Sequence, residues 1–176
     1  MKKLTHREIV LRQTKKQTST RLRFCAVLNN IRSLYNVGSI FRTADGAGIE
    51  KLWLCGITGH PPDKMIAKTA LGAEKVVAWE HTTSALAVIR DLKKQGYQIV
   101  LLEQAKHSIP YQDFVPKAPV CLVVGNEISG VAEELLSLCD HAIEIEMRGS
   151  KNSLNVAVAF GIAAYHIQGK LIKERI

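Results

Sequence analysis

An arginine stands on the polar side of an otherwise core-facing helix in the segment NNIRSLYNVGSIFRTADGAG, residues 29–48. Apolar side chains recur there at the spacing of one helix face, namely Val37, Ile40, Phe41 and Ala44. Arg42 lies opposite that face, above Gly38, and helical side chains lean toward the helix N-terminus. The guanidinium is therefore placed to bind an anion near the amide groups of the helix start. A surface pair with Asp45 is the competing interpretation.

A carboxylate follows a wholly apolar strand pattern in a second loop, VCLVVGNEISGVAEELL, residues 120–136. Gly125 permits a tight turn or the close approach of a ligand. Glu127 comes two residues later, at the carboxyl end of the strand, where α/β proteins bind ligands. A solvated loop acid is the competing interpretation. Ser129 is predicted to cap the helix that follows.

Polar residues crowd a third loop, which precedes a helix that is apolar on almost every side, in EIEMRGSKNSLNVAVAFGIAAY, residues 144–165. An all-round apolar helix is buried in a core or an interface. Ser153 is predicted to cap this helix, and Asn36 to cap the helix of the first loop. Asn155 would then lie in the first turn, where asparagine is poorly favoured. Its presence there suggests a functional role.

Short β-branched runs alternate with helical patterns along the rest of the chain, which predicts a parallel sheet covered by helices on both faces. Expected strands span residues 24–28, 51–55, 75–79, 98–103, 120–124 and 142–146, and expected helices span residues 37–46, 63–70, 84–95, 130–138 and 153–168. The three polar loops follow strand ends, where such sheets bind ligands. A dinucleotide-binding glycine loop is not expected, because GAGIEK, residues 46–51, follows a helix and has lysine at the third glycine position.

Composition limits the class of protein. The 176 residues, 47% of them hydrophobic, suffice for one ordinary domain. No run approaches the roughly 18 apolar residues of a membrane span, and the first residues lack the apolar core of a signal peptide, so we expect a cytoplasmic protein. The four cysteines and six histidines are scattered without zinc-ligand spacing, and we expect no metal.

Positive charge is concentrated at the start of the chain. Residues 1–23 contain eight basic side chains and one acid, Glu8, and so carry seven of the eight net positive charges. Such an arm suits nucleic acid phosphates, and its binding would weaken with salt. A solvated arm without a ligand is an equally good interpretation, whereas a membrane surface is disfavoured because no apolar face accompanies the charges. The candidate phosphate contacts are Lys15, Lys16, Arg21 and Arg23.

Three motifs follow one another along the chain. They are N-x-R-x-x-x-N-V-G-x-I-x-R-T-A at residues 30–44, L-V-V-G-N-E-x-x-G-V at 122–131 and S-L-N-V-A-V-A at 153–159. Together they resemble the motifs of the SpoU or TrmH family of the SPOUT superfamily, whose members transfer a methyl group from S-adenosylmethionine to ribose 2′-hydroxyls of RNA. The resemblance implies a single methyltransferase domain, residues 24–176, preceded by the basic arm, residues 1–23.

The resemblance also implies a fold that the alternation of elements does not. It implies a deep C-terminal trefoil knot, which is otherwise rare, and a homodimer that is required for activity. By matching motif positions, the residues that line the S-adenosylmethionine pocket would be Leu102, Gly125, Ile145 and Leu154. Arg42 would act at the 2′-hydroxyl, with Asn36, Glu127, Ser153 and Asn155 ordering the site. No metal is required.

The chemistry of arginine limits what Arg42 can do. A ribose hydroxyl is a poor nucleophile, whereas a sulfonium methyl is already activated, so help is needed at the hydroxyl. A guanidinium stays protonated at neutral pH and does not act as a base unless the substrate phosphate helps. We expect Arg42 at least in part to stabilise the forming alkoxide. Arg32 and Arg148 are candidates to hold RNA phosphates, with ordinary surface charges as the alternative.

Three other classes of function stay open. A non-catalytic RNA-binding or ribosome-assembly module with this fold would be favoured by loss of Arg42, Asn36 or Asn155, and all three are present. A SPOUT enzyme that methylates a base nitrogen would need a different residue near the acceptor. A flavodoxin-like nucleotide binder leaves Arg42, Glu127 and Asn155 unexplained. The sequence does not name the RNA, and tRNA is slightly favoured over rRNA because the basic arm is short.

Overall fold

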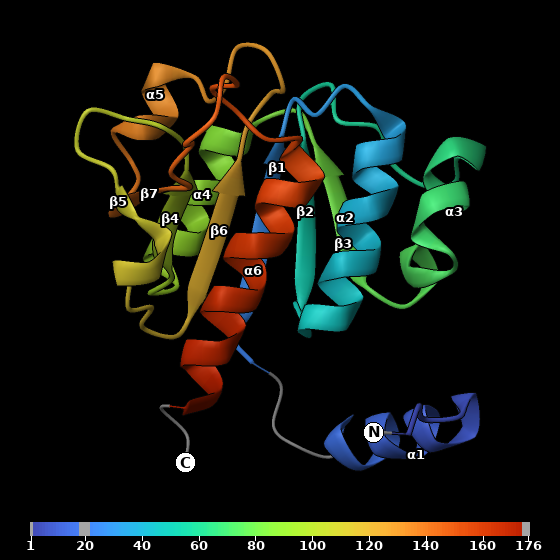
Figure 1. The fold of residues 1–176 in the computed structure, drawn as a ribbon. Coiled ribbons are helices and arrows are strands. Elements are labelled where there is room, and N and C mark those ends of the chain that lie inside the picture. Colours follow the sequence, from blue (N-terminus) through green and yellow to red (C-terminus); the bar gives the residue numbers. More distant parts are fainter. Residues whose placement is uncertain (1, 18–21, 174–176) are drawn as a thin grey trace.

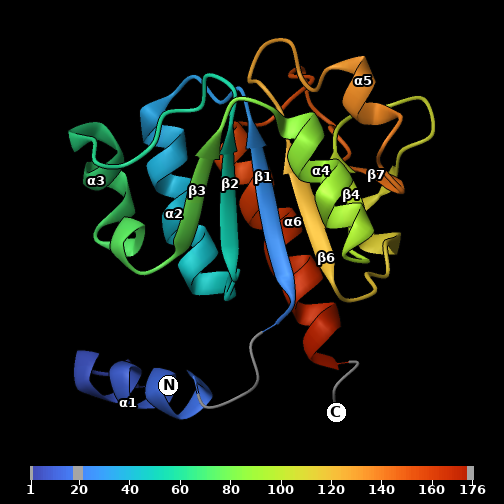
Figure 2. The same cartoon turned by 180° about the vertical axis from the view of Figure 1, so that it is seen from behind.

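The computed structural model describes residues 2–17 and 22–173, which include a parallel seven-stranded sheet (Figures 1 and 2). The strand order is β3-β2-β1-β6-β4-β7-β5, and every neighbouring pair is parallel, as predicted. The strands are β1 (Phe24–Asn29), β2 (Lys51–Cys55), β3 (Ala78–Thr82), β4 (Gln98–Leu102), β5 (Ile109–Pro110), β6 (Val120–Val124) and β7 (His141–Glu144).

Helices cover both faces of the sheet, which confirms the expected layers. The helices are α1 (His6–Gln17), α2 (Leu34–Ala47), α3 (Lys64–Ala70), α4 (Ala85–Lys94), α5 (Glu133–Leu136) and α6 (Val156–Lys173). On one face α2 and α6 pack side by side, with α3 outside α2 (Figure 1). The opposite face is covered by α4 (Figure 2).

The central strands β1 and β6 are buried along their whole length. Their side chains alternate between the two layers, with Phe24 and Leu28 in the core under α2 and α6, and Cys25 and Val27 in the core under α4. Strands that are apolar on both faces are stable only between two helical layers, which explains their central place. The carboxyl ends of β1, β6 and β4 therefore meet at one edge of the sheet, from which the first two polar loops leave.

Several elements predicted from the sequence differ from those in the structure. The strand expected over residues 75–79 is β3 at 78–82, because residues 73–75 form a 3-10 turn after Gly72, whose φ is +96°. The helix expected over 130–138 is only the single turn α5, because Gly130 has a φ of +65° and pairs with Asn126 in a bridge. The two-residue strand β5 was not expected, since two residues are too few to show a period.

The helix caps also differ from expectation. Ser33, not Asn36, caps α2, and its hydroxyl accepts a hydrogen bond from the Asn36 backbone at 3.3 Å. Asn155, not Ser153, caps α6 through its Oδ1, which accepts from two backbone amides of the first turn at 2.9 and 3.4 Å. Ser129 caps no described helix, because α5 starts only at residue 133. The side chain of Asn36 is therefore free for another contact.

The basic arm contains α1, which stands apart from the α/β body in Figure 1. Thr5 and Glu8 form a capping box at its start. The Thr5 backbone donates to Glu8 Oε2 at 2.7 Å, and the Glu8 backbone donates to Thr5 Oγ1 at 3.4 Å. These reciprocal bonds satisfy two amide groups at the start of α1 and so favour the helix.

The candidate phosphate contacts of the arm are only partly described. Lys15 and Lys16 lie in α1, but their side chains are outside the described part of the chain, and so is all of Arg21. Arg23 precedes β1, with its guanidinium 5.7 Å from the centroid of the Tyr97 ring. Arg23 thus lies at the amino edge of the sheet, opposite the polar loops. The RNA role of these residues stays a prediction.

Two features of the described residues, 2–17 and 22–173, bear on the class of protein. None of their helices is both long enough and apolar enough to cross a bilayer. Nor do they gather three His, Cys, Asp or Glu side chains in a geometry suited to a metal ion. The trefoil knot and the domain boundary at residue 24 stay predictions.

Candidate functional site

Three of the predicted site residues meet at the carboxyl edge of the sheet. Glu127, in the loop after β6, accepts a hydrogen bond on Oε1 from Asn36 Nδ2 at 3.0 Å. Asn36 lies in the first turn of α2, and its Oδ1 accepts from Asn155 Nδ2 at 3.0 Å. We call Glu127, Asn36 and Asn155 the polar triad. It joins the starts of α2 and α6 to the β6 loop, across sequence separations of 91 and 119 residues.

Main-chain groups of the first loop also hold Glu127. The backbone N–H of Arg32 donates to Oε2 at 3.0 Å, and that of Ser33 donates to Oε1 at 3.1 Å. Burial by itself would raise the pKa of Glu127, but the donors from the Arg32 backbone and from Asn36 outweigh it and lower the pKa. Glu127 is therefore an ionised carboxylate at neutral pH that fixes the start of α2.

Two asparagines and a threonine that sequence reasoning missed hold these loops together. Asn126 Nδ2 donates to the carbonyl of Asn30 at 2.8 Å, and Asn30 Oδ1 accepts from the Ile57 backbone at 3.1 Å. Asn30 has a φ of +60°, a region that asparagine tolerates better than most residues. The buried hydroxyl of Thr58 accepts from the Ile31 backbone at 3.0 Å. The available signal was that each asparagine is the second residue after an expected strand, residues 24–28 and 120–124.

Arg42 is not part of the polar triad. It comes six residues after Asn36, which is about 9 Å along α2. Its side chain is exposed, and no carboxylate among the described residues lies within ion-pair distance, so the pair with Asp45 is not formed. Gly38 does not open a path for the guanidinium either, because a Cβ there would collide with the Thr69 hydroxyl of α3. Arg42 is an outward-facing cation available to an external anion.

The four predicted cofactor residues line one cavity of about 290 Å³, between the ends of β4 and β6 and the start of α6. They are Leu102, Gly125, Ile145 and Leu154. The volume is near the lower end for small-molecule sites. Apolar side chains suit the faces of an aromatic base, and the carboxylates of Glu103, Glu127 and Glu144, which also line the cavity, suit a positive charge. The residues present therefore fit S-adenosylmethionine, which combines both groups.

Gly125 has a structural reason for its lack of a side chain. A Cβ at this position would lie 2.6 Å from the carbonyl oxygen of Gly130. The glycine therefore lets the loop fold back so that Asn126 and Gly130 pair, which places Glu127 at the tip of the turn. Close approach of this loop to itself explains Gly125 before any ligand is considered.

The remaining predicted residues differ in their availability. Arg32 and Arg148 are both exposed, and no ion pair holds the Arg32 side chain in the described part of the chain. Arg148 pairs with Glu146 at 2.9 Å, which raises the pKa of the guanidinium. A phosphate could bind Arg32 directly, whereas at Arg148 it would compete with Glu146. Ser153 lines the cavity, and its hydroxyl bonds no other group of residues 2–17 or 22–173.

Comparison with known proteins gives a consistent result. The model of the SpoU rRNA Methylase family matches residues 23–165. The tRNA (guanosine(18)-2′-O)-methyltransferase of Aquifex aeolicus is 33% identical over 140 residues, which are 80% of this chain and 66% of that enzyme. The 23S rRNA (guanosine-2′-O-)-methyltransferase RlmB of Vibrio parahaemolyticus is 34% identical over 140 residues, 79% of this chain and 56% of that enzyme.

Solved structures show the same likeness. The crystal structure of the A. aeolicus TrmH/SpoU tRNA modifying enzyme superposes with a TM-score of 0.81 and 28% identity, covering 94% of this chain and 86% of that one. An AdoMet-bound rRNA methyltransferase from Sinorhizobium meliloti has a TM-score of 0.78 and 28% identity, covering 83% of this chain and 56% of that one. The chain spans between about half and two thirds of the length of the curated relatives it matches.

Proposed function

Because the chain belongs to the SpoU/TrmH family, we propose that it transfers a methyl group from S-adenosylmethionine to a ribose 2′-hydroxyl of RNA. One observation carries the proposal: the polar triad of Glu127, Asn36 and Asn155 lies directly beside the cavity that fits the cofactor. Glu127 belongs to both, since it lines the cavity and anchors the triad. A structural network would not need to border a ligand cavity.

The cavity residues bind and orient the cofactor. Bound S-adenosylmethionine supplies an activated methyl group on a cationic sulfonium. Leu102, Ile145 and Leu154 provide the apolar contacts for its base. Glu103 and Glu144 also line the cavity and attract the positively charged end of the cofactor. The ligand thereby acquires one orientation, as an in-line transfer requires.

Arg42 has the charge to act on the attacking oxygen. An unpaired guanidinium stabilises an alkoxide as it forms and binds the neighbouring phosphate through its second N–H group. Ser153 lines the cavity with a free hydroxyl, and we place it and Asn155 around the ribose. Arg42 acts by charge, and the proton leaves through the substrate phosphate or water because a guanidinium does not take it.

The basic groups outside the cavity hold the RNA. Arg32 lies next to Glu127 and binds a phosphate close to the target nucleotide. Arg148 and the basic arm, with Lys15, Lys16, Arg21 and Arg23, add contacts farther along the strand. The substrate is tRNA or rRNA, with tRNA slightly favoured. Because these RNAs are used in the cytoplasm, we place the protein there as well.

A homodimer completes the site. Three apolar side chains of α6 are each about half exposed, namely Val158 (52%), Tyr165 (51%) and Ile172 (44%). Their spacing of seven residues places them on one face of the helix. The Tyr165 hydroxyl lies beside Gly46, one turn beyond Arg42 on α2. A second chain seated on this face would therefore lie close to Arg42. We propose that Arg42 of each chain serves the polar triad of its partner, which explains why it stands apart from its own triad.

The reaction is tested with S-adenosylmethionine that carries a labelled methyl group. Wild type and Arg42→Ala are incubated with total RNA, which is then separated into tRNA and rRNA and digested to nucleosides. We expect label in a 2′-O-methylnucleoside from one RNA class with the wild type and little with the variant. A cofactor-binding protein that labels neither RNA, even RNA from cells lacking this protein, would overturn the transferase and favour the non-catalytic RNA-binding module.

The dimer is tested by mixing two inactive variants. If Arg42 acts across the interface, a dimer of one Arg42→Ala chain and one Glu127→Ala chain has one intact site. Random mixing then restores about a quarter of wild-type activity. If both residues act within one chain, the mixture stays inactive, and the shared site is wrong.

A further inference from the structure

A cluster of three rings lies outside the site described above. The His60 ring stacks on the Trp79 ring with centroids 5.8 Å apart and planes 20° apart. The His81 ring lies 4.6 Å from the His60 ring at an angle of 45°. We call these residues the stacking platform. Trp79 is half-buried against the core under α2, whereas His60 and His81 are exposed.

Main-chain contacts fix both histidines in place. His60 Nδ1 is 3.0 Å from the carbonyl oxygen of Pro61, and His81 Nε2 is 3.2 Å from that of Gly56. A carbonyl oxygen only accepts, so each of these ring nitrogens donates. The rings are thereby oriented without any ligand, and a planar group that binds them loses little freedom in the protein.

His81 of the stacking platform lies toward the same edge of the sheet as the polar triad. His81 pairs with Leu54 and Thr82 with Cys55, and Cys55 in turn pairs with Asn29 at the end of β1. With strands about 4.8 Å apart, β3 lies about 10 Å from β1, whose loop carries the first part of the site. A strand of RNA bound at the site can therefore reach the platform within a few nucleotides.

Positive charge accompanies the rings. Lys64 begins α3 four residues after His60, and Lys68 lies one turn later with its Nζ 5.8 Å from the centroid of the exposed Tyr35 ring. Neither lysine is in an ion pair with another described residue. The nearby acid Asp63 is engaged as the cap of α3. Unpaired cations on α3, the helix that follows the His60 loop, together with exposed rings match the alternating phosphates and bases of a single RNA strand.

A second pair of aromatic rings, in which His166 contacts Tyr111, has a packing role and serves as a comparison. His166 meets Tyr111 edge-on at 5.4 Å, and both side chains are half-buried. The His166 Nε2 is bonded to the carbonyl of Phe114 and ties α6 to the loop after β5. That pair connects two elements of the fold and is half-buried, whereas His60 and His81 are exposed to solvent.

We propose that the stacking platform binds an unpaired base of the substrate RNA, next to the nucleotide held at the polar triad. The proposal rests on the RNA methyltransferase function proposed above and names a subsite of it. Histidine and tryptophan rings are used by proteins to stack splayed bases, and stacking tolerates any base because every base has a π-face. The platform contributes to the affinity for RNA and to the position of the strand relative to the polar triad. The reacting ribose does not contact it.

The test follows the fluorescence of Trp79, after Trp53→Phe has removed the other tryptophan. The probe is a six-nucleotide single-stranded RNA, compared with a ribose phosphate strand of the same length without bases. We expect the RNA to quench Trp79, and His60→Ala to weaken its binding about 5- to 100-fold. His60→Phe keeps a stacking ring and should retain most of the affinity. His141→Ala removes an exposed histidine at the opposite edge of the sheet and should bind as the wild type does.

Three results would overturn the platform. They are equal binding of the two strands by the wild type, wild-type affinity in His60→Ala, and equal losses in His60→Phe and His60→Ala. The same proteins are assayed for methyl transfer to total RNA. If the wild type labels RNA but shows one of these three results, the platform is wrong and the enzyme proposal stands. If base-dependent binding is seen without labelling of any RNA, the enzyme proposal fails and the platform stands as an RNA-binding site.

Discussion

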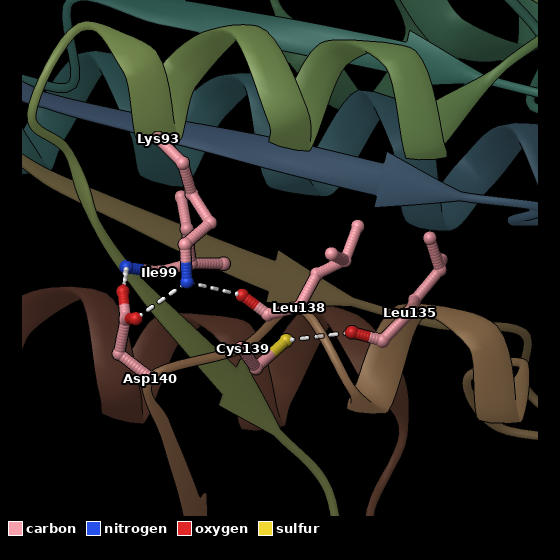
Figure 3. A network of polar contacts seen from close by, with 6 residues as sticks. All are labelled: Lys93, Ile99, Leu135, Leu138, Cys139 and Asp140. Carbon is pink, nitrogen blue, oxygen red and sulfur yellow. Dashed lines mark hydrogen bonds and ion pairs between the residues drawn. The ribbon is translucent and has the colours of Figure 1, made fainter.

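Two polar networks lie at opposite edges of the sheet. One contains an ion pair, and in the other a carboxylate has only neutral partners. At the amino edge, Lys93 of α4 donates to Asp140 Oδ1 at 2.6 Å and to the Leu138 carbonyl at 2.8 Å (Figure 3). Asp140 Oδ2 accepts from the Ile99 backbone at 2.8 Å, and Cys139 Sγ donates to the Leu135 carbonyl at 3.2 Å (Figure 3). We call these six residues the amino-edge clasp.

The polar triad at the carboxyl edge pairs its carboxylate with neutral donors only. Glu127 accepts from two backbone amides and from Asn36, while the cation Arg42 stands unpaired on α2. In the amino-edge clasp, a cation and a carboxylate neutralise each other. A cation that is already paired inside the fold is less available to a substrate anion than an unpaired cation. The comparison therefore supports the proposal that the triad and Arg42 act in function, and it predicts that the clasp contributes stability.

The largest expected effect is the loss of activity in Arg42→Ala. Removing a group that stabilises developing oxyanion charge lowers the rate by about 100-fold or more. The free energy of unfolding should change by less than about 0.5 kcal/mol, because an exposed, unpaired side chain is lost. Initial rates of methyl transfer and urea unfolding measure the two. Arg42→Lys is the control, and full activity in it would show that the planar guanidinium is unimportant.

Asp140→Ala should give the opposite pattern. It leaves the Ile99 amide without its acceptor and the Lys93 ammonium with only the Leu138 carbonyl, which costs about 1–2 kcal/mol of unfolding free energy at these partly exposed sites. The rate per folded molecule should stay at the wild-type value. Asp91→Ala is the matched control, because it breaks only the exposed Lys94 pair at 3.2 Å and should cost under about 0.5 kcal/mol. A rate as low as that of Arg42→Ala would break the contrast between the two edges.

A lower pH should destabilise the fold through both networks, because each contains a carboxylate with a lowered pKa. The two networks therefore differ less in this property than in their effect on the rate. Burial opposes the shift in each, and hydrogen bonds from Arg32 and Asn36 at Glu127, and from Ile99 and Lys93 at Asp140, outweigh it. A lowered pKa stabilises the fold above the unfolded values, about 4.3 for Glu and 3.9 for Asp, and this stability is lost as pH falls through the folded pKa.

Glu127→Gln and Asp140→Asn should therefore each lose less stability than the wild type does between about pH 5 and pH 2. Urea unfolding across this range measures the slopes. At pH 7 the two variants should differ in rate, since only Glu127 borders the cavity. A wild-type slope in either variant would mean that the carboxylate gains nothing from its hydrogen bonds.

Much of the fold and of the site could be predicted from the sequence. Alternating elements predicted the parallel sheet and both helical layers, because burial on two faces leaves a continuous apolar strand pattern, as in β6. Polar residues after strand ends predicted the loops that carry Glu127 and Asn155. These signals are local in the sequence, which is why one chain suffices to detect them.

Contacts between distant segments could not be predicted in the same way. Asn36 looks able to cap its own helix, and Ser153 looks able to cap the helix that Asn155 in fact caps. Only the fold shows that Ser33 replaces Asn36 as a cap and leaves it to bond Glu127 and Asn155. Gly38 looked like open space below Arg42, but α3 packs there. In each case the deciding partner lies tens of residues away in the chain.

The smallest effect is expected at Cys139, the weakest member of the amino-edge clasp. A thiol is a poor donor, so Cys139→Ala should cost less than about 1 kcal/mol of unfolding free energy and leave the rate unchanged. Burial, with a smaller contribution from Asp140, raises the pKa of the thiol to about 11. It therefore stays protonated at pH 7.5 and should react slowly with iodoacetamide in the folded protein.

Cys139→Ser provides the control, because it keeps a donor near the Leu135 carbonyl at almost the same volume. If Cys139→Ala is as destabilising as Asp140→Ala, while Cys139→Ser is not, the thiol bond holds the α5 loop as firmly as the ion pair does. We expect instead that the contacts of the clasp with ionised groups contribute more stability than the thiol contact. A hydrogen bond to an ionised group is worth about twice a neutral one. The Lys93 and Asp140 pair would then contribute most of the stability of the clasp, whereas the unpaired Arg42 is proposed to act on the substrate.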